Sequence, residues 1–393
     1  MITGLGVISP VGDGIDAFWE SLLTGRSATA EVSSFDASAF PVHVGCEVRG
    51  PGLESSRQPQ PGRASLLAAA AGRQALAQAG LSGAALADVP LCVGTTMGES
   101  CWLEAWKPAD VRAGPAAVPA QELVRSGPDQ VGRDIAAELS LGGRVTVLAG
   151  ACAAGNYALG HALDLIRLGR ADRVLAGGTD AFSRVAFTGF ARLGALAKHA
   201  CRPFSADRDG LVLGEGAAML VVESAASAAA RGAEPLAEIA GVGLSGDAFH
   251  IVSPDPRGDG AARAISAALL DAGVAPDEVG YLSAHGTGTP ANDRAEVAAA
   301  QTVFGRRGPP MSSIKATTGH GLGAASAIEA VACVLALRAQ VAPATWNFTA
   351  TDPDCAWDVI PNEPRELEFD VALSNAYAFG GCNASIVLRA AGT

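Results

Sequence analysis

Cys152 is the residue of this chain whose surroundings best suit a nucleophile. It lies in RVTVLAGACAAGNYALG, after a short, fully buried strand predicted over residues 144–149 and before a helical pattern that runs through Ile166. This pattern places Cys152 at a strand-to-helix elbow, where unpaired N–H groups lower the pKa of a thiol and can hold an oxyanion. Small neighbouring residues leave room for a substrate carbonyl, although a buried, inert thiol is the alternative.

Two histidines could work with that thiol. His285 directly follows a predicted strand, in HGTGTP, and His320 lies in KATTGHGLG, five residues after Lys315. Two neutral imidazoles that donate through Nε2 can hold a thioester carbonyl as it becomes an enolate, while the cysteine carries an acyl group. Either histidine alone would more often be structural, but the three residues together indicate thioester chemistry.

The elements that would position these residues occur twice. A helix, a strand and a glycine-containing turn follow one another in each copy, at residues 64–79, 90–93 and 94–98 and again at 262–272, 280–284 and 285–289. The Cys152 elbow is likewise similar to KATTGHGLG and the helix predicted over 324–338. Strands that alternate with helices indicate an α/β fold with mixed or parallel sheets, and the duplication indicates a pseudo-twofold with the active site between the halves.

Three other segments complete the predicted organisation. An alanine-rich segment at 223–235 separates the copies, so residues 1–233 and 234–393 are predicted to form the two halves. Residues 99–129 contain two tryptophans but no clean period, which is typical of an insertion that packs on a neighbour. The chain ends in VALSNAYAFGGCNASIVLRA, which predicts two strands joined by a turn.

The composition limits the class of protein. Of 393 residues, 49% are hydrophobic and 17% are charged, which predicts a large core and a subunit interface. The net charge of −12, with no block of Lys or Arg, argues against nucleic-acid binding. We expect no apolar run long enough to span a bilayer and no signal sequence, hence a cytoplasmic protein without a membrane partner. Eight scattered cysteines without a CxxC pair predict reduced thiols and no metal.

Five motifs give the chain a family resemblance. In order and spacing, the sequence resembles the decarboxylating β-ketoacyl-acyl carrier protein synthases of the thiolase-fold superfamily at GACAAGN, PFSADRDGLVLGEGA, AHGTGTPANDRAE, KATTGHGLGAAS and NAYAFGGCN. The resemblance covers nearly the whole chain. It implies a thiolase-like fold, with two duplicated halves in a layered α-β-α-β-α arrangement.

The resemblance also implies a reaction and its catalytic residues. The reaction is a decarboxylative Claisen condensation of an acyl thioester with malonyl-acyl carrier protein, in fatty-acid or type II polyketide biosynthesis. Cys152 matches the nucleophile, and His285 and His320 match the pair that promotes decarboxylation of the malonyl group. Lys315 matches the lysine that supports His320, and Glu296 matches its carboxylate partner. No metal or nucleotide cofactor is implied, because the substrates are carried on the phosphopantetheine of the carrier protein.

Four further residues match substrate-contacting positions of the family. Phe379 matches the gating phenylalanine, whose backbone N–H joins that of Cys152 in the oxyanion hole. Thr287 and Thr289 match the threonines that hold the pantetheine arm, and Met97 falls where the family lines its acyl pocket. The alternative for the threonines is that they are only turn hydroxyls. Near the gate, Cys382 and Tyr377 stand where the family often has Thr and Phe, which leaves the preferred acyl chain open.

The implied partners are an acyl carrier protein and a second subunit. The resemblance implies a dimer, either a homodimer or a heterodimer with a chain-length-factor-like subunit, with residues 99–129 covering part of the contact. One alternative function is a catalytically silent chain-length subunit, which the retained Cys152, His285 and His320 argue against. The other is a nondecarboxylating thiolase or acyltransferase, which the use of two histidines instead of one histidine and a second cysteine argues against.

Overall fold

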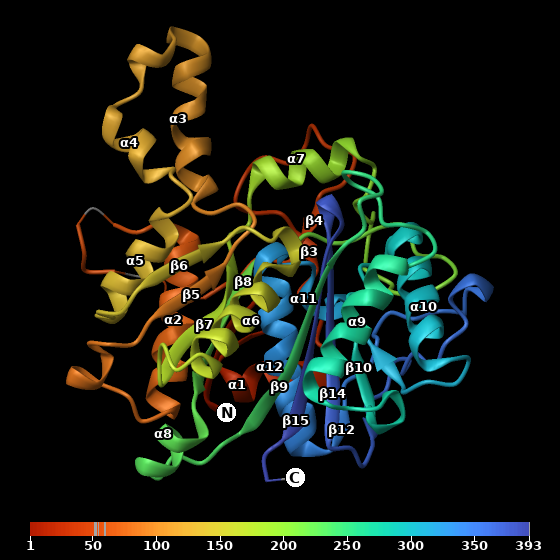
Figure 1. Cartoon of the computed structure of the whole chain (residues 1–393). Coiled ribbons are helices and arrows are strands. Elements are labelled where there is room, and N and C mark those ends of the chain that lie inside the picture. The colour runs from red at the N-terminus through yellow and green to blue at the C-terminus, as the bar shows by residue number, and fades with distance from the viewer. Residues whose placement is uncertain (51–52, 54, 59, 393) are drawn as a thin grey trace.

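The computed structural model describes residues 1–50, 53, 55–58 and 60–392, and Figure 1 shows its elements. Ten strands, five from each half, follow one another in a single sheet. In spatial order, the first half contributes β6 (Val145–Leu148), β5 (Leu91–Gly94), β7 (Arg173–Asp180), β8 (Gly216–Glu223) and β1 (Ile2–Ser9). The second half continues with β9 (Ala237–Gly246), β15 (Cys382–Ala390), β14 (Val371–Ala378), β10 (Tyr281–Ser283) and β11 (Met311–Ser312).

The strand order confirms the predicted duplication. From the centre outward, each half runs first, fifth, fourth, second and third strand of its own sequence order. The directions also repeat: in both halves the two inner pairs are antiparallel and the two outer pairs are parallel. The halves join where Ile2 of β1 pairs with Ala237 of β9. The boundary near residue 233 stays a prediction, because one sheet runs through both halves.

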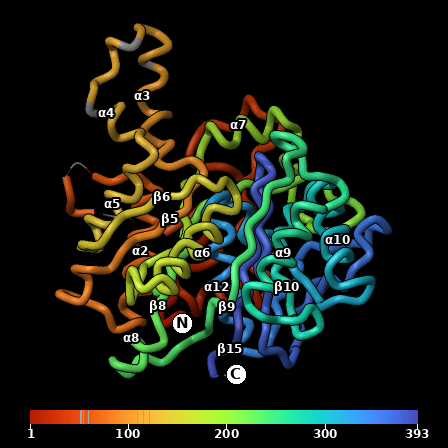
Figure 2. The backbone as a smooth tube through the Cα atoms, in the orientation of Figure 1, coloured from red at the N-terminus to blue at the C-terminus, as the bar shows by residue number. Residues whose placement is uncertain are grey.

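The five strands of each half form one strand layer, and helices form the other three layers of the α-β-α-β-α arrangement. The central layer is α6 (Ala154–Arg167) and α12 (Ala325–Ala339), which contact each other and strands of both halves. The outer layers are α2 (Arg63–Gln78) with α5 (Gln130–Leu139) on the first half and α9 (Asp259–Ala272) with α10 (Pro290–Phe304) on the second. Figure 2 shows these helices on either side of the strands. The largest core cluster lies around the central layer.

The apolar stretch around the central helix α12 contradicts the prediction that no segment is long enough to span a bilayer. The 18-residue stretch Leu322–Ala339 is long and apolar enough to cross a membrane by length and composition, so the expectation that no such run exists is wrong. Of the residues in this stretch, 83% are buried inside the protein. A helix packed on all sides is hydrophobic all round, which is the physical reason for this composition.

Residues 99–129 form a helical hairpin that projects from the body of the molecule (Figure 1). It contains α3 (Ser100–Ala113) and α4 (Ala120–Arg125), and the guanidinium of Arg125 lies 3.4 Å above the ring of Trp102. Because the two helices pack mainly on each other, neither has the apolar stripe of a helix on a core. Val111 and Val124 are 73% and 63% exposed.

One predicted strand differs from the structure, and the two terminal strands are confirmed. The strand expected at residues 144–149 is β6, but its four residues are only half-buried, because β6 is the edge of the sheet and not an interior strand. The terminal strands are present as β14 and β15, joined by the turn Phe379–Gly381. The remaining elements are α1 (Ile15–Thr24), α7 (Arg184–Arg192), α8 (Ala225–Ala230), α11 (Lys315–Thr318), β2 (Gly12–Asp13), β3 (Ala30–Glu31), β4 (Val44–Gly45), β12 (Val341–Ala342) and β13 (Arg365–Glu366).

Candidate active site

Cys152 lies at the elbow that the sequence predicts. It is the middle residue of a single 3₁₀ turn, Ala151–Ala153, between β6 and α6. Ala151 has a φ of 47°, in the left-handed region that residues with a side chain rarely adopt. Leu322, with a φ of 51°, holds the same place before α12. Both halves therefore bend the chain in the same way where a strand layer meets a central helix.

The thiol of Cys152 is protonated in the resting protein. Only 6% of the residue is exposed, and this burial raises the pKa of Cys152 to about 12, although the ammonium of Lys315 favours the thiolate. The expectation that the elbow lowers this pKa is wrong, because desolvation outweighs the favourable charge. Attack on a thioester therefore requires a neighbouring base to take the proton.

One cavity of about 340 Å³ brings most of the predicted residues together. Cys152 lines it from the elbow before α6, His285 from the end of β10, and His320 from the segment between α11 and α12. The ring centroids of the two histidines are 5.3 Å apart, with the planes at 83°. Within the described residues, no group of three or more His, Cys, Asp or Glu side chains could hold a metal ion.

Lys315 holds His285 from behind. Its Nζ donates to the carbonyl oxygen of His285 at 2.6 Å and lies 3.4 Å from Nδ1. Because an ammonium only donates, Nδ1 accepts, and the neutral ring carries its proton on Nε2. Burial and then the charge of Lys315 lower the pKa of His285 well below its usual value of 6.5, so the ring is neutral at neutral pH. A neutral Nε2–H donor is the group that an enolate oxygen needs.

The carboxylate partner of Lys315 is Glu329, not Glu296. Lys315 and Glu329, each 1% exposed, form an ion pair and a hydrogen bond between Nζ and Oε1. The predicted pairing with Glu296 is wrong because the next helix, α12, passes directly behind the site. The expectation that Lys315 supports His320 through a hydrogen bond is also wrong. The hydrogen bonds of its Nζ go to His285 and Glu329, and only its charge acts on His320.

Glu296, on α10, fixes the backbone around His285 instead. Its two carboxylate oxygens accept the N–H groups of His285 at 2.8 Å and Gly286 at 2.7 Å. Burial raises the pKa of Glu296 to about 8, while these two hydrogen bonds favour the charged form. Glu296 therefore positions the turn that carries His285, Thr287 and Thr289.

His320 is neutral and only partly hydrogen-bonded. Its main chain is held on both sides, since its N–H donates to Val212 at 2.7 Å and its carbonyl accepts from Gly214 at 2.9 Å. Burial and the charge of Lys315 lower the pKa of His320 well below 6.5. The buried Nδ1 has no hydrogen-bond partner among the described residues. The main chain of His320 is thus held in place, and Nδ1 is left to form a hydrogen bond with a substrate or a water.

The mouth of the cavity carries the predicted gate and threonines. Phe379 is 38% exposed and packs on Phe190, with ring centroids 5.5 Å apart. Gly380 follows with a φ of 80°, a conformation that lets the turn reverse directly after Phe379. The hydroxyls of Thr287 and Thr289 bond each other at 2.9 Å and line the same cavity.

Met97 is the predicted substrate-contacting residue that lies apart from this cavity wall. It packs against the apolar cluster that contains Cys152, but does not line the cavity itself. Its N–H donates to Asp180, a fully buried residue that sequence reasoning missed. Asp180 also accepts from Thr95, Thr96 and Gly323, so it joins the turn after β5 to the second elbow. An acidic residue at the end of the apolar strand VLAGGTD was the available signal.

Comparison with known proteins identifies the family of the chain. The family described as Beta-ketoacyl synthase, N-terminal domain matches residues 1–228, and Beta-ketoacyl synthase, C-terminal domain matches residues 236–349. Among curated relatives, Nodulation protein E of Rhizobium sp. (strain N33) is 41% identical over 397 residues, with 99% of this chain and 98% of the relative covered. The 3-oxoacyl-[acyl-carrier-protein] synthase 2 of Coxiella burnetii is 38% identical, with 99% and 97% covered.

Solved structures agree. A structure titled "The ishigamide ketosynthase/chain length factor" is 42% identical with a TM-score of 0.95, covering 100% of this chain and 98% of that one. A type II PKS acyl-carrier protein in complex with its ketosynthase, AntDE:AntF, gives 32% identity and a TM-score of 0.91, with 99% and 98% covered. The duplicated fold, the cavity with Cys152, His285 and His320, and these matches agree in every part: the chain belongs to the β-ketoacyl synthase family, the condensing acyltransferases of the thiolase fold.

Proposed function

We propose that this chain is a 3-oxoacyl-[acyl carrier protein] synthase in which Cys152, His285 and His320 carry the chemistry. The observation that supports it most is their meeting in one cavity from three distant parts of the chain. The 3-oxoacyl-[acyl-carrier-protein] synthase 2 relative supports the substrate class. The product would be a 3-oxoacyl-carrier protein two carbons longer, in fatty-acid or type II polyketide biosynthesis.

In the first step, the acyl group moves to Cys152. The thiol attacks the thioester carbonyl, and its proton passes to the neutral ring of His320, which has a nitrogen without a hydrogen-bond partner among the described residues. His285 cannot take it, because Nε2 carries the ring proton and Nδ1 accepts from Lys315. The carbon–sulfur bond to the pantetheine arm then breaks, and the leaving thiolate takes up that proton. The high pKa of Cys152 makes proton removal during attack a requirement of this step.

In the second step, the malonyl group loses carbon dioxide. The bond to its carboxylate breaks, and the electron pair forms an enolate whose oxygen accepts from Nε2 of the histidines. The cavity lining contains Asp209 and Asp247 but no Lys or Arg, so the malonyl carboxylate meets no cation at the wall and its loss is favoured. The enolate carbon attacks the acyl-Cys152 carbonyl, and Cys152 leaves as a thiolate that regains a proton. No metal or nucleotide is required.

The proposed partners are an acyl carrier protein and a second subunit, in the cytoplasm. The AntDE:AntF structure contains a carrier protein with its ketosynthase, which supports the first. The edge strand β6 supports the second, because its residues Val145–Leu148, three of them apolar, are half-buried in the single chain and an edge strand readily pairs with another. We favour a homodimer, and light scattering of the purified chain tests it, since a stable, active monomer would refute the dimer.

Mass spectrometry of intact carrier proteins tests the reaction. The wild type, incubated with acyl- and malonyl-carrier protein, should yield a carrier two carbons longer as its 3-oxo product. Cys152→Ala should give none, because no acyl group is held for the enolate. Extension by this variant at the wild-type rate would refute the assignment. Extension that appears only when a homologous subunit is added would instead show that the chain works in a heterodimer.

A further inference from the structure

Asp180 ends strand β7 at a point where the two halves of the molecule meet. The residue is 0% exposed. Gly178 lies two positions earlier, on the same face of the strand. A Cβ at Gly178 would lie 3.2 Å from Cα of Gly155, in α6, and 2.4 Å from the carbonyl oxygen of Gly323, in the second elbow. The end of β7 therefore packs against both the Cys152 elbow and its counterpart in the second half.

The carboxylate of Asp180 is held by four donors. Oδ1 accepts from Oγ1 of Thr95 and from the N–H of Met97, both at 2.8 Å. Oδ2 accepts from the N–H of Thr96 at 2.8 Å and from that of Gly323 at 2.7 Å. Within the part of the chain that the structure describes, Asp180 forms no ion pair. A single carboxylate oxygen thus joins a turn of the first half to the elbow of the second.

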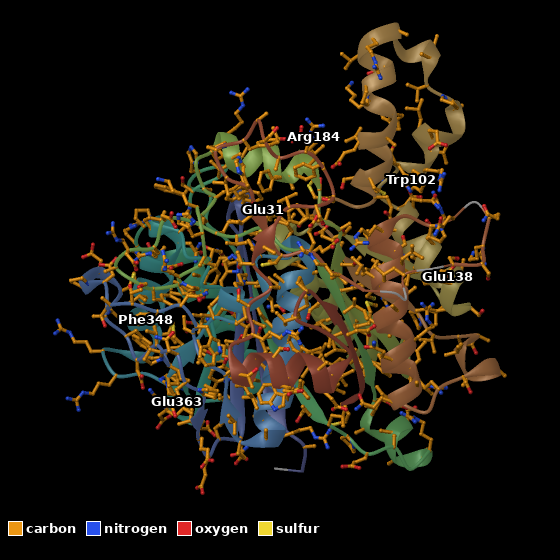
Figure 3. All side chains as sticks on the ribbon, turned by 180° about the vertical axis from the view of Figure 1, so that it is seen from behind. Glu31, Trp102, Glu138, Arg184, Phe348 and Glu363 are labelled. Carbon is orange, nitrogen blue, oxygen red and sulfur yellow. The ribbon has the colours of Figure 1, made fainter. Side chains whose placement is uncertain are left out.

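The turn at residues 95–98 connects β5 to the projecting hairpin. Helix α3 begins at Ser100, just after this turn, and Figure 3 shows Trp102 at the foot of the hairpin. Within the turn, the N–H of Gly98 donates to Oγ1 of Thr95 at 2.9 Å, and that hydroxyl donates in turn to Asp180. The carboxylate therefore fixes the whole turn to the body of the molecule.

The second elbow bears directly on the reacting groups. Gly323 comes three residues after His320, and Leu322, between them, belongs to the apolar cluster that contains Cys152. Met97, from the turn, packs against the same cluster. The separation of the turn from the second elbow therefore sets both the space around the thiol and the place of the histidine.

From these contacts we propose that Asp180 is a positioning residue for the transfer of the acyl group to Cys152, because it holds the second elbow, and with it His320, against the turn that carries Met97. The proposal rests on the proposed function. Loading requires a nitrogen of His320 within reach of the thiol proton, and a misplacement of about 1 Å can cost about a hundredfold in rate.

The charge of Asp180 has a second effect, which a purely structural residue would lack. Burial raises the pKa of Asp180 to about 6, while its four hydrogen bonds favour the charged form, so the group is a carboxylate at pH 8. Three charged groups act on the thiol of Cys152: Lys315 favours the thiolate, whereas Asp180 and Glu329 oppose it. Removal of the charge on Asp180 should therefore make the thiol easier to ionise, even while it displaces His320.

The test compares Asp180→Asn with the wild type in two reactions of the same thiol. Acyl loading from an acyl-pantetheine thioester, measured by the intact mass of the acyl-enzyme, should slow about tenfold or more, because the amide NH2 faces backbone N–H groups that need an acceptor. Alkylation of Cys152 by iodoacetamide at pH 8 requires only the thiolate and should quicken about twofold or more. The opposite signs distinguish a charged positioning residue from a residue that only stabilises the fold.

Glu223→Gln is the matched control. Glu223 is also a carboxylate with 0% exposure, and it lies at the far end of the β7–β8 pair from Asp180. At about 3.3 Å per residue, roughly 23 Å of strand separates the two positions. This variant loses the ion pair with Arg231 and should be less stable, but it should leave both reactions of Cys152 unchanged. Equal changes in the two variants would trace the effect to lost stability and would overturn the proposal.

Three other outcomes would also overturn the proposal. Unchanged loading in Asp180→Asn would mean that the elbow keeps its place without the carboxylate. Slower alkylation would mean that the charge does not act on the thiol. Faster alkylation of Cys92, which is 0% exposed on β5, together with Cys152 would show a general opening of the first half, and peptide mass spectrometry separates the two sites.

A milder variant and a direct measurement keep the test decisive. If Asp180→Asn does not fold, Thr95→Val removes one of the four donors and should slow loading in the same direction, and an unchanged rate contradicts the positioning role. If the wild type loads no acyl group, the proposed function fails. Hydrogen exchange then decides the role of Asp180, because the amides of residues 95–98 and 321–324 should exchange faster together in Asp180→Asn, and unchanged exchange excludes it.

Discussion

Removing the ammonium of Lys315 should cost stability in a way that identifies its partner. Lys315 and Glu329 are each 1% exposed, so Lys315→Met leaves a buried carboxylate without a counterion. Breaking one side of such a pair costs about 3–5 kcal/mol. That is a large part of the roughly 5–15 kcal/mol that holds a domain folded.

A second substitution separates the contributions. Lys315→Met/Glu329→Gln removes the orphaned charge, but the carbonyl of His285 still lacks the donor that Lys315 provides at 2.6 Å. An unsatisfied buried acceptor costs about 1–3 kcal/mol, so the double variant should recover about 2 kcal/mol of the loss. Urea unfolding at one protein concentration and pH 9, where Glu329 is charged in the folded wild type, measures both values. The penalty of the single variant should shrink toward lower pH, because burial raises the pKa of Glu329 to about 7 and protonation removes its charge.

Glu296 provides the control, and activity provides a second readout. Lys315→Met/Glu296→Gln should recover nothing, because Glu296 contacts the N–H groups of His285 and Gly286 instead of the ammonium. Recovery with Glu296→Gln and none with Glu329→Gln would refute the ion-pair assignment. Malonyl decarboxylation should stay low in every variant without Lys315, since Nδ1 of His285 has lost the donor that fixes its tautomer.

Cys152, the two histidines and Glu296 each allow a direct test. Iodoacetamide labelling of Cys152, followed by peptide mass spectrometry, should quicken about tenfold per pH unit from about pH 7 to 9 without a plateau, because burial holds its pKa near 12; a plateau near pH 7 would contradict this. His285→Ala should slow malonyl decarboxylation more than acyl loading, measured by burst labelling of Cys152, whereas His320→Ala should slow both steps, because His320 also takes the thiol proton; equal loss of both steps in His285→Ala would contradict this division. The pKa of Glu296 rises from 4.5 to about 8 on folding, so its contribution to stability is present below pH 4.5 and lost as pH rises through 8. In Glu296→Gln, the free energy of unfolding should therefore depend less on pH between 4.5 and 8.

Local sequence signals predicted the helices and strands, whereas the hairpin and the partner of Lys315 depend on tertiary packing. Helices with an apolar stripe and a terminal glycine, such as α9 before Gly273, lie within a few residues of their predicted bounds. The hairpin at α3 and α4 escaped prediction because its helices pack on each other. Glu329 escaped because nothing in the spacing around Lys315 favours it over Glu296. A lone carboxylate in the apolar stretch ASAIEAVACVLAL did signal that a buried cation must face it.

The duplicated fold builds two elbows but only one nucleophile site, and packing explains the difference. Cys152 and Gly323 are the middle residues of equivalent turns, each after a residue in the left-handed region. A Cβ at Gly323 would lie 2.7 Å from Oδ2 of Asp180 and 2.8 Å from the backbone nitrogen of Thr96, so the second elbow has no room for a side chain. Asp180 fills the space that the first elbow leaves open to the cavity. The second half therefore supplies His285 and His320 to the cavity that Cys152 lines from the first half, and the site lies between the two halves.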